Sequence, residues 1–271
     1  MKSSINCLIW EKTGDMIIVE NLSKKFQLSK QQRKELATDA KDITAVDQIS
    51  FTCQPGRIFS LLGPNGAGKT TTLRMLATIL KPTAGTISVA GHDVVAEEEQ
   101  VRAKIGFLTG STGLYQRLTP NELVKYFADL YGVDANSFRQ RKEALFTMLD
   151  MNDFAKKRIG QLSTGMKQKV SIVRTMIHDP AVVIFDEPTS GLDVVTAENI
   201  IKLIRQCKED GKTVIFSSHI MSEVDLLCDD LAIIHKGKLR YSSTMEAFRN
   251  QMQTDSLTKE FIRIVSAEKV G

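Results

Sequence analysis

The 271-residue sequence has no apolar run long enough to cross a bilayer, although 42% of its residues are hydrophobic. A membrane-spanning helix needs about 18–20 consecutive apolar residues, so we do not expect this chain to span a membrane by itself. Near the N-terminus the apolar core is limited to residues 7–10, which is too short for a secretory signal peptide. These two absences predict a cytoplasmic protein.

Cysteine pairs at the spacing of metal or redox sites are missing as well. The four cysteines are scattered and form no C-x-x-C pair: Cys7, Cys53, Cys207 and Cys228. This pattern indicates neither a zinc site nor a disulfide framework, and isolated thiols are typical of a reducing compartment. A strong charge imbalance is also lacking. The formal net charge of +4 at pH 7 is too small to choose between ATP, a nucleic acid and an anionic membrane surface.

A complete phosphate-binding loop is present at residues 63–70, which read Gly-Pro-Asn-Gly-Ala-Gly-Lys-Thr. An apolar run at 58–62 precedes it and a helical pattern at 71–80 follows it, so the loop lies between a predicted strand and a predicted helix. Glycines let the backbone wrap around phosphate, and the helix N-terminus adds partial positive charge. We expect Lys69 to reach the β- and γ-phosphates and the Thr70 hydroxyl to bind Mg²⁺. The predicted nucleotide contacts are Gly63, Pro64, Asn65, Gly66, Ala67, Gly68, Lys69, Thr70 and Thr71.

Two carboxylates follow a second apolar run, at residues 181–185. A continuous apolar run is typical of a central parallel strand, and α/β sheets bind ligands at the carboxyl ends of such strands. Asp186 would hold Mg²⁺, directly or through water, and Glu187 would orient and deprotonate an attacking water. A strand that ends in a solvated acidic turn is the alternative, but the phosphate-binding loop in the same chain favours the first interpretation.

Residues 162–169, Leu-Ser-Thr-Gly-Met-Lys-Gln-Lys, begin a helical pattern that ends near residue 180. Ser163 is a favourable N-cap, and the free N–H groups at a helix start can bind an anion. By itself the segment is more typical of an ordinary capped helix.

Four motifs occur in one order, namely the phosphate-binding loop, the Leu-Ser-x-Gly segment, Phe-Asp-Glu-Pro-Thr-Ser-Gly-Leu-Asp at 185–193 and Ser-Ser-His at 217–219. In this order they resemble the nucleotide-binding domain of ABC ATPases over residues 16–240. The resemblance implies an α/β P-loop NTPase fold of the ABC type. This fold has a mixed sheet core, an antiparallel β subdomain and an inserted α-helical lobe.

The resemblance also implies roles for the later motifs. Ser163 and Gly165 match the signature that contacts the γ-phosphate of ATP held by a partner subunit. Residues 164 and 166 are Thr and Met where the family form has Gly and Gln, so this chain has no Gln at the position from which the family's side-chain bond is made. Asp193 ends the loop that runs along the dimer seam.

For catalysis, the resemblance makes Glu187 the catalytic carboxylate and His219 the switch histidine at the γ-phosphate, with Lys69 beside them. The alternative for His219 is a plain loop histidine after a strand at 213–216. Phe26 resembles the aromatic that stacks on adenine, after a strand at 16–19 and a turn at 21–23, and its alternative is a core aromatic.

Two segments depart from the family pattern. Residues 27–43 are longer than the usual hairpin and rich in Lys, Gln, Arg and Glu, which predicts a solvated insertion. The position of the family's Q-loop glutamine falls at Gly110, at the end of a strand beginning at 105, and no carboxamide follows until Gln116. The loop that couples to a membrane partner is expected at 110–115.

The expected organisation is an N-terminal extension at 1–15, an ATPase core at 16–98 and 181–240, a helical lobe at 99–180 and a helical tail at 241–271. A capping box should start a helix at residues 119–122. The apolar face expected for that helix consists of Leu123, Tyr126, Phe127 and Leu130. The packing residues expected in the tail are Phe248, Leu257, Phe261, Ile262 and Ile264.

One phosphate-binding loop and one signature imply a second ATPase subunit, with a homodimer expected. The resemblance therefore predicts the ATP-binding, ATP-hydrolysing subunit of an ABC transporter, with ATP and Mg²⁺ as cofactors. It would power export through a separate polytopic membrane permease and lie peripherally on the inner face of the cell membrane. Exporters of the ABC-2 type, including sodium-extruding and drug-exporting ones, are the nearest in pattern.

Two alternatives remain open at this point. A soluble ABC ATPase that acts on DNA or ribosomes is one, although the short lobe without sustained heptads and the single nucleotide domain argue against it. No nucleic-acid partner is therefore expected. A regulatory module that binds ATP with little turnover is the other; the changes at residues 110 and 166 favour it, whereas Lys69, Glu187 and His219 argue against it.

Overall fold

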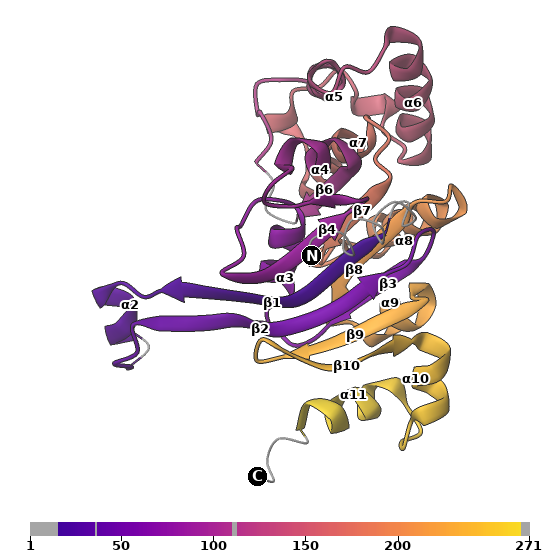
Figure 1. Cartoon of the computed structure of the whole chain (residues 1–271). Helices are drawn as coiled ribbons and strands as arrows, with labels where there is room; N and C mark the ends of the chain where they lie inside the picture. Colours follow the sequence, from indigo (N-terminus) through magenta and orange to yellow (C-terminus); the bar gives the residue numbers. More distant parts are fainter. Residues whose placement is uncertain (1–15, 36, 110–112, 267–271) are drawn as a thin grey trace, which may run out of the picture.

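Two β-sheets organise the computed structural model, which describes residues 16–35, 37–109 and 113–266 (Figure 1). An antiparallel sheet has the order β2-β1-β4-β5, and a six-stranded sheet has the order β10-β9-β3-β8-β7-β6, parallel except for β10. The first comprises β1 (Ile17–Gln27), β2 (Asp42–Cys53), β4 (Ala84–Val89) and β5 (His92–Asp93). The second comprises β3 (Ile58–Leu62), β6 (Ile105–Thr109), β7 (Val182–Asp186), β8 (Thr213–Ser218), β9 (Asp230–His235) and β10 (Lys238–Thr244). The predicted fold class, a mixed sheet with an antiparallel β subdomain, is confirmed.

The central strands of the six-stranded sheet are covered on both faces, which explains their continuous apolar runs. Every residue of β3, β7 and β8 is buried. Successive side chains point to opposite faces, so Val183 and Phe185 join the core beneath the helices while Val182 and Ile184 join the core between the two sheets.

The register places the carboxyl ends of these strands together. Leu62 at the end of β3 pairs with Ser218, and Asp186 at the end of β7 pairs with Ser217. Residues that follow the three strands therefore emerge at one edge of the sheet.

Ten α-helices and two 3₁₀ turns complete the described part of the chain. They are α2 (Lys30–Glu35), α3 (Lys69–Leu76), α4 (Glu98–Lys104), α5 (Pro120–Leu130), α6 (Ala135–Met148), η1 (Asn152–Phe154), η2 (Ile159–Gln161), α7 (Thr164–Met176), α8 (Val194–Glu209), α9 (Met221–Leu227), α10 (Met245–Gln251) and α11 (Leu257–Ser266). α3 packs against strands of both sheets, and α5 and α6 form the end of the molecule opposite α10 and α11 (Figure 1). The expected helical lobe at 99–180 thus contains one strand of the core sheet, β6. None of the helices in these described ranges is long and apolar enough to span a membrane.

The capping box of α5 is present, but the apolar face predicted for this helix is right only in part: Leu123 and Phe127 pack in the core, whereas Tyr126 and Leu130 do not. Leu123 is buried together with Val124 and Ala128, whereas Tyr126 is 50% exposed and Leu130 is 65% exposed. The residues of α5 that are buried and those that were expected to be buried both repeat at helical spacing, as two overlapping stripes. The position of α7, against which α5 packs, decides which of them is buried.

Two further expectations from the sequence are corrected. The turn expected at 21–23 is a bulge inside β1, because β2 and β4 continue to pair with this strand on both sides and Asn21 takes a φ of 48°. In the tail, Phe248 is buried and Leu257, Phe261 and Ile264 pack against the core, but Ile262 is 53% exposed on the outer face of α11.

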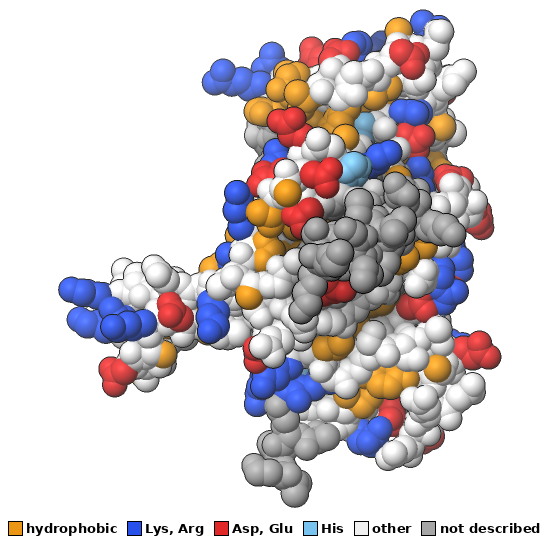
Figure 2. Space-filling model, viewed as in Figure 1, with side chains coloured by type: hydrophobic (Ala, Val, Ile, Leu, Met, Phe, Trp, Pro, Cys, Tyr) orange, Lys and Arg blue, Asp and Glu red, His pale blue; other side chains and the backbone are white. Residues whose placement is uncertain are grey.

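The 27–43 segment forms an arm, as its polar composition predicts. β1 and β2 extend beyond the body of the molecule, and α2 at the tip buries none of its residues (Figure 1). Figure 2 shows basic side chains gathered at the end of this arm.

Candidate functional site

The phosphate-binding loop occupies the turn between β3 and α3, where neighbouring backbone leaves room only for glycine at two positions. A Cβ on Gly63 would lie 2.3 Å from the Ile234 carbonyl oxygen, and one on Gly68 would lie 2.6 Å from the Ala45 carbonyl oxygen. Gly68 also has a φ of 108°, which L side chains rarely adopt. β9 and β2 therefore press directly on the loop and hold its shape.

Lys69 is the first residue of α3, and its side chain is only 4% exposed. Its ammonium donates hydrogen bonds to the carbonyl oxygens of Gly63 at 2.7 Å and Pro64 at 3.2 Å, and lies 3.2 Å from the Glu187 carboxylate. A buried charge needs such partners. The residue is thus held at the floor of the loop.

Thr70 and Asp186, the two predicted metal ligands, meet at this floor. The Thr70 hydroxyl donates to Asp186 Oδ1 at 3.0 Å, and the Ser217 hydroxyl donates to the same oxygen at 2.8 Å. Mg²⁺ prefers oxygen ligands and commonly takes one or two from the protein, with phosphates and water supplying the rest. The donor set therefore fits Mg²⁺ bound together with a nucleotide.

Glu187 is held in an unusual backbone conformation, with a φ of 48°. Its N–H donates to the Ser217 hydroxyl at 2.9 Å, and its carboxylate, on a side chain that is 26% exposed, lies 3.5 Å from His219 Nδ1 as well as beside Lys69. A non-glycine residue at positive φ is a strain often found at functional sites. The three predicted catalytic side chains, Lys69, Glu187 and His219, are thus brought together from three strand ends.

A cavity of about 400 Å³ opens over the phosphate-binding loop. The residues that line it are Ala45, Asn65, Gly66, Ala67, Gly68, Lys69, Thr70, Thr71 and Glu187. Ala45 was missed by the sequence analysis because its role depends on β2 lying across the loop. Ser217 was missed although it belongs to the Ser-Ser-His motif, since only its bonds to Asp186 and Glu187 reveal its function.

The signature and seam residues form a second group, on an exposed surface. Ser163 caps α7, its hydroxyl accepting the Met166 N–H at 3.2 Å. A Cβ on Gly165 would lie 3.5 Å from Asp193 Oδ2, so the signature lies beside the start of α8. Hydrogen bonds from the Thr196 N–H and hydroxyl lower the pKa of Asp193 and keep this N-cap ionised.

Phe26 lies on β1 opposite Ile43, with the Lys24 ammonium 5.2 Å from its ring centre. Its ring is half-buried. Ala45, two residues beyond Ile43 on β2, lines the cavity, so the hairpin that carries Phe26 borders the loop. Gly110, the expected Q-loop position, lies outside the described residues.

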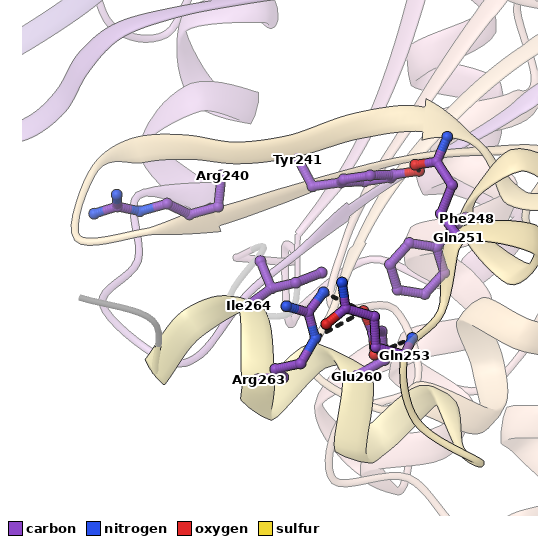
Figure 3. Close-up of a pocket in the computed structure, with 8 residues that line it drawn as sticks. All are labelled: Arg240, Tyr241, Phe248, Gln251, Gln253, Glu260, Arg263 and Ile264. Carbon is purple, nitrogen blue, oxygen red and sulfur yellow. Dashed lines mark hydrogen bonds and ion pairs between the residues drawn. The ribbon is translucent and has the colours of Figure 1, made fainter. Parts of the chain in front are cut away.

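A larger cavity, of about 660 Å³, lies away from this site, between β10 and the helices α10 and α11 (Figure 3). Glu260 there is buried and accepts hydrogen bonds from Arg263 and from the Gln253 N–H. These bonds, the one from Arg263 first, lower the pKa of Glu260. The Arg263 guanidinium is already bound to the Glu260 carboxylate, whose negative charge would repel phosphate. This cavity is therefore less suited to a triphosphate than the glycine loop.

Comparison with known proteins gives consistent matches. Residues 46–190 match the family model described as ABC transporter. The chain is 40% identical over 248 residues to the ABC transporter ATP-binding protein NatA of Bacillus subtilis (strain 168), covering 91% of this chain and 97% of that protein. It is 37% identical over 197 residues to the Nod factor export ATP-binding protein I of Burkholderia pseudomallei (strain 1710b), covering 73% and 65%. Among solved structures, it resembles a dimeric structure of MJ0796, a bacterial ABC transporter cassette, with a TM-score of 0.73 and 25% identity, covering 84% and 98%.

Proposed function

Because the chain belongs to the ABC transporter family and is one of its ATP-binding proteins, we propose that its ATP site works with Mg²⁺ in a homodimer that powers export. The chain is an ATPase subunit that works with a membrane permease. The observation that carries the mechanism is the meeting of Lys69, Glu187 and His219 beside the Thr70–Asp186 pair.

The residues of the site would have separate roles in ATP hydrolysis. Backbone N–H groups of residues 65–71 and the Lys69 ammonium bind the phosphates. Glu187 accepts a proton from the attacking water, and His219, at 3.5 Å from that carboxylate, lies where it can contact the γ-phosphate. Thr70 and Asp186 would hold Mg²⁺, which neutralises charge on the phosphate oxygens when it is bound.

A second copy of the chain would complete each ATP site with its Ser163 and Gly165. The surface around these residues supports this proposal. Val194 and Val195, which follow Asp193 at the start of α8, are 85% and 72% exposed. Adjacent apolar side chains at such exposure are typical of a surface that is covered by a partner. The solved structure of MJ0796 is dimeric, which supports a dimer.

The permease would dock on the helical lobe, which would place this subunit on the inner face of the membrane. Tyr115, Tyr126 and Leu130 leave large apolar side chains exposed there. Tyr115 is the last residue of the segment expected to couple to a membrane partner, and the rings of Tyr115 and Tyr126 meet edge to face at 6.3 Å. The exported compound would be a small or drug-like molecule or Na⁺; the Nod factor export relative supports the direction of transport.

Steady-state ATP hydrolysis by Glu187→Gln tests the catalytic assignment. We expect turnover to fall about 10²–10⁴-fold, as for loss of a general base, while ATP binding persists. Glu209→Gln, at the exposed end of α8, is the matched control and should retain full activity. Unchanged turnover in Glu187→Gln would remove Glu187 from this role.

Isolation of the tagged chain from membranes in mild detergent tests the transport assignment. A stoichiometric polytopic membrane protein is expected to co-purify. Recovery with ribosomes or DNA instead would contradict it.

A further inference from the structure

Glu223, in the first turn of α9, connects the two loops that carry Glu187 and His219. Its Oε2 accepts a hydrogen bond from the Ser218 hydroxyl at 2.8 Å, and its Oε1 accepts one from the Thr189 hydroxyl. Ser218 immediately precedes His219, and Thr189 follows Glu187 by two residues. One carboxylate therefore joins the ends of β7 and β8 outside the reacting groups.

Both hydroxyls that Glu223 holds belong to buried residues. Hydrogen bonds to an ionised acceptor are stronger than neutral ones, and water competes poorly for them in a buried setting. The Ser218 hydroxyl also accepts the Ile220 N–H at 3.0 Å. The backbone is thus fixed immediately before and after His219.

On the β7 side, the bond to Thr189 holds a compact turn. The Ser190 N–H donates to the Glu187 carbonyl at 3.2 Å, and the Leu192 N–H donates to the Thr189 carbonyl at 3.2 Å. This turn leads directly to Asp193, on the surface where a second subunit is proposed to dock. A displacement of that surface would reach His219 through Thr189, Glu223 and Ser218.

We propose that Glu223 is a positioning residue for ATP hydrolysis, which sets the His219 imidazole against the Glu187 carboxylate and couples that placement to the Asp193 loop. The inference rests on the proposed roles of Glu187 and His219. Glu223 bonds to neither of these side chains and is not among the residues lining the phosphate-binding cavity, so it acts on their placement.

Substitutions at Glu223 separate positioning from binding. Glu223→Ala removes both bonds, and we expect kcat to fall about 10–100-fold, as for a misplaced catalytic group, with KM for ATP within about twofold of the parent. Glu223→Gln should restore most of the activity, because a hydroxyl can accept as well as donate and an amide can bond to both. Ser222→Ala, at an exposed position of the same helix, is the control.

The partner on the other loop gives an independent measurement. Thr189→Val removes the hydroxyl with little change of shape and should lower kcat, whereas Thr189→Ser should retain it. If the two residues act as one link, the double variant Thr189→Val/Glu223→Ala should lose little more than either single variant. Additive losses would contradict the link.

Glu187→Gln measured in parallel separates failure of this inference from failure of the proposed function. Loss of turnover in Glu187→Gln with normal kcat in Glu223→Ala would overturn the positioning role alone. A lower thermal midpoint and a higher KM in Glu223→Ala, without rescue by Glu223→Gln, would likewise overturn it, since they indicate a general structural role. Retained turnover in Glu187→Gln would refute the function on which the inference depends.

Discussion

The ammonium of Lys69 lies 3.2 Å from the carboxylate of Glu187, at the floor of the phosphate-binding loop. Two backbone carbonyls share the same ammonium. The residue proposed to bind phosphate and the residue proposed to activate water are therefore coupled by charge. A change at either one alters the electrostatic setting of the other.

Lys69→Met keeps the length of the side chain but removes its charge. We expect ATP to bind about 10–100-fold more weakly, because a hydrogen bond to a charged group contributes about 1.5–3 kcal/mol. Equilibrium binding of a fluorescent ATP analogue measures this. Lys202→Met, at an exposed position of α8, should bind the analogue normally. Equal affinities for the two variants would remove Lys69 from the binding site.

Gly68→Ala should destabilise the fold more than Gly91→Ala does. Both glycines have positive φ, 108° and 82°, so both variants carry backbone strain of about 1–2 kcal/mol. Only at Gly68 would the new Cβ clash, at 2.6 Å from the Ala45 carbonyl oxygen, which adds about 1–3 kcal/mol. Urea unfolding of the two variants isolates the clash. Equal unfolding free energies would show that β2 does not constrain the loop.

The surroundings of His178 lead us to expect a lower free energy of unfolding in mild acid. Its ring stacks on Tyr131 with centres 3.9 Å apart, and Nε2 donates to the Ile105 carbonyl at 2.9 Å, which leaves Nδ1 as the unprotonated nitrogen. Within the described residues, Nδ1 is buried without a hydrogen-bond partner. Burial lowers the pKa of His178 below its ordinary 6.5. The unfolded chain therefore binds more protons than the native one near pH 6, and stability falls as pH drops below about 6.5 through the folded pKa.

His178→Phe tests this pH dependence because it retains a ring that can stack on Tyr131. We expect the variant to lose about 1 kcal/mol at pH 7 with the bond to Ile105, and the gap to narrow as the pH falls from 7 to 5. Urea midpoints of both proteins at three pH values give this difference. A gap that stays constant with pH would contradict a neutral, buried imidazole.

Because Val194 and Val195 are exposed, we expect their side chains to contribute apolar contacts to the proposed dimer. Burial of a valine side chain contributes about 1.5–3 kcal/mol, so replacing both residues with glutamate should weaken ATP-dependent dimerisation at least about tenfold per residue. The measurement is light scattering with size exclusion, in the Glu187→Gln background with ATP. Ile262→Glu, on the exposed face of α11, is the control. Unchanged dimerisation would place the seam elsewhere.

Local hydrogen bonding explains why parts of the site could be predicted from the sequence. Ser163 caps α7 as expected, and Thr119 makes the expected capping box; Asp193, expected only as the end of the seam loop, also caps the helix that follows it. Each of these bonds joins residues three positions apart, so the residue types within one helical turn are enough to predict it. The glycine loop is local in the same sense, because Gly68, Lys69 and Thr70 are adjacent.

The sequence by itself thus determined the nucleotide loop, its flanking strand and helix, and the acidic strand end at Asp186. Only the tertiary structure decided that Ala45 borders the cavity and that Ser217 and Glu223 join loops distant in the chain. It also decided which stripe of α5 is buried and that Asn21 forms a bulge instead of a turn. The physical reason is that these features depend on packing and pairing between separate segments, and one helical or strand pattern is compatible with several such partners.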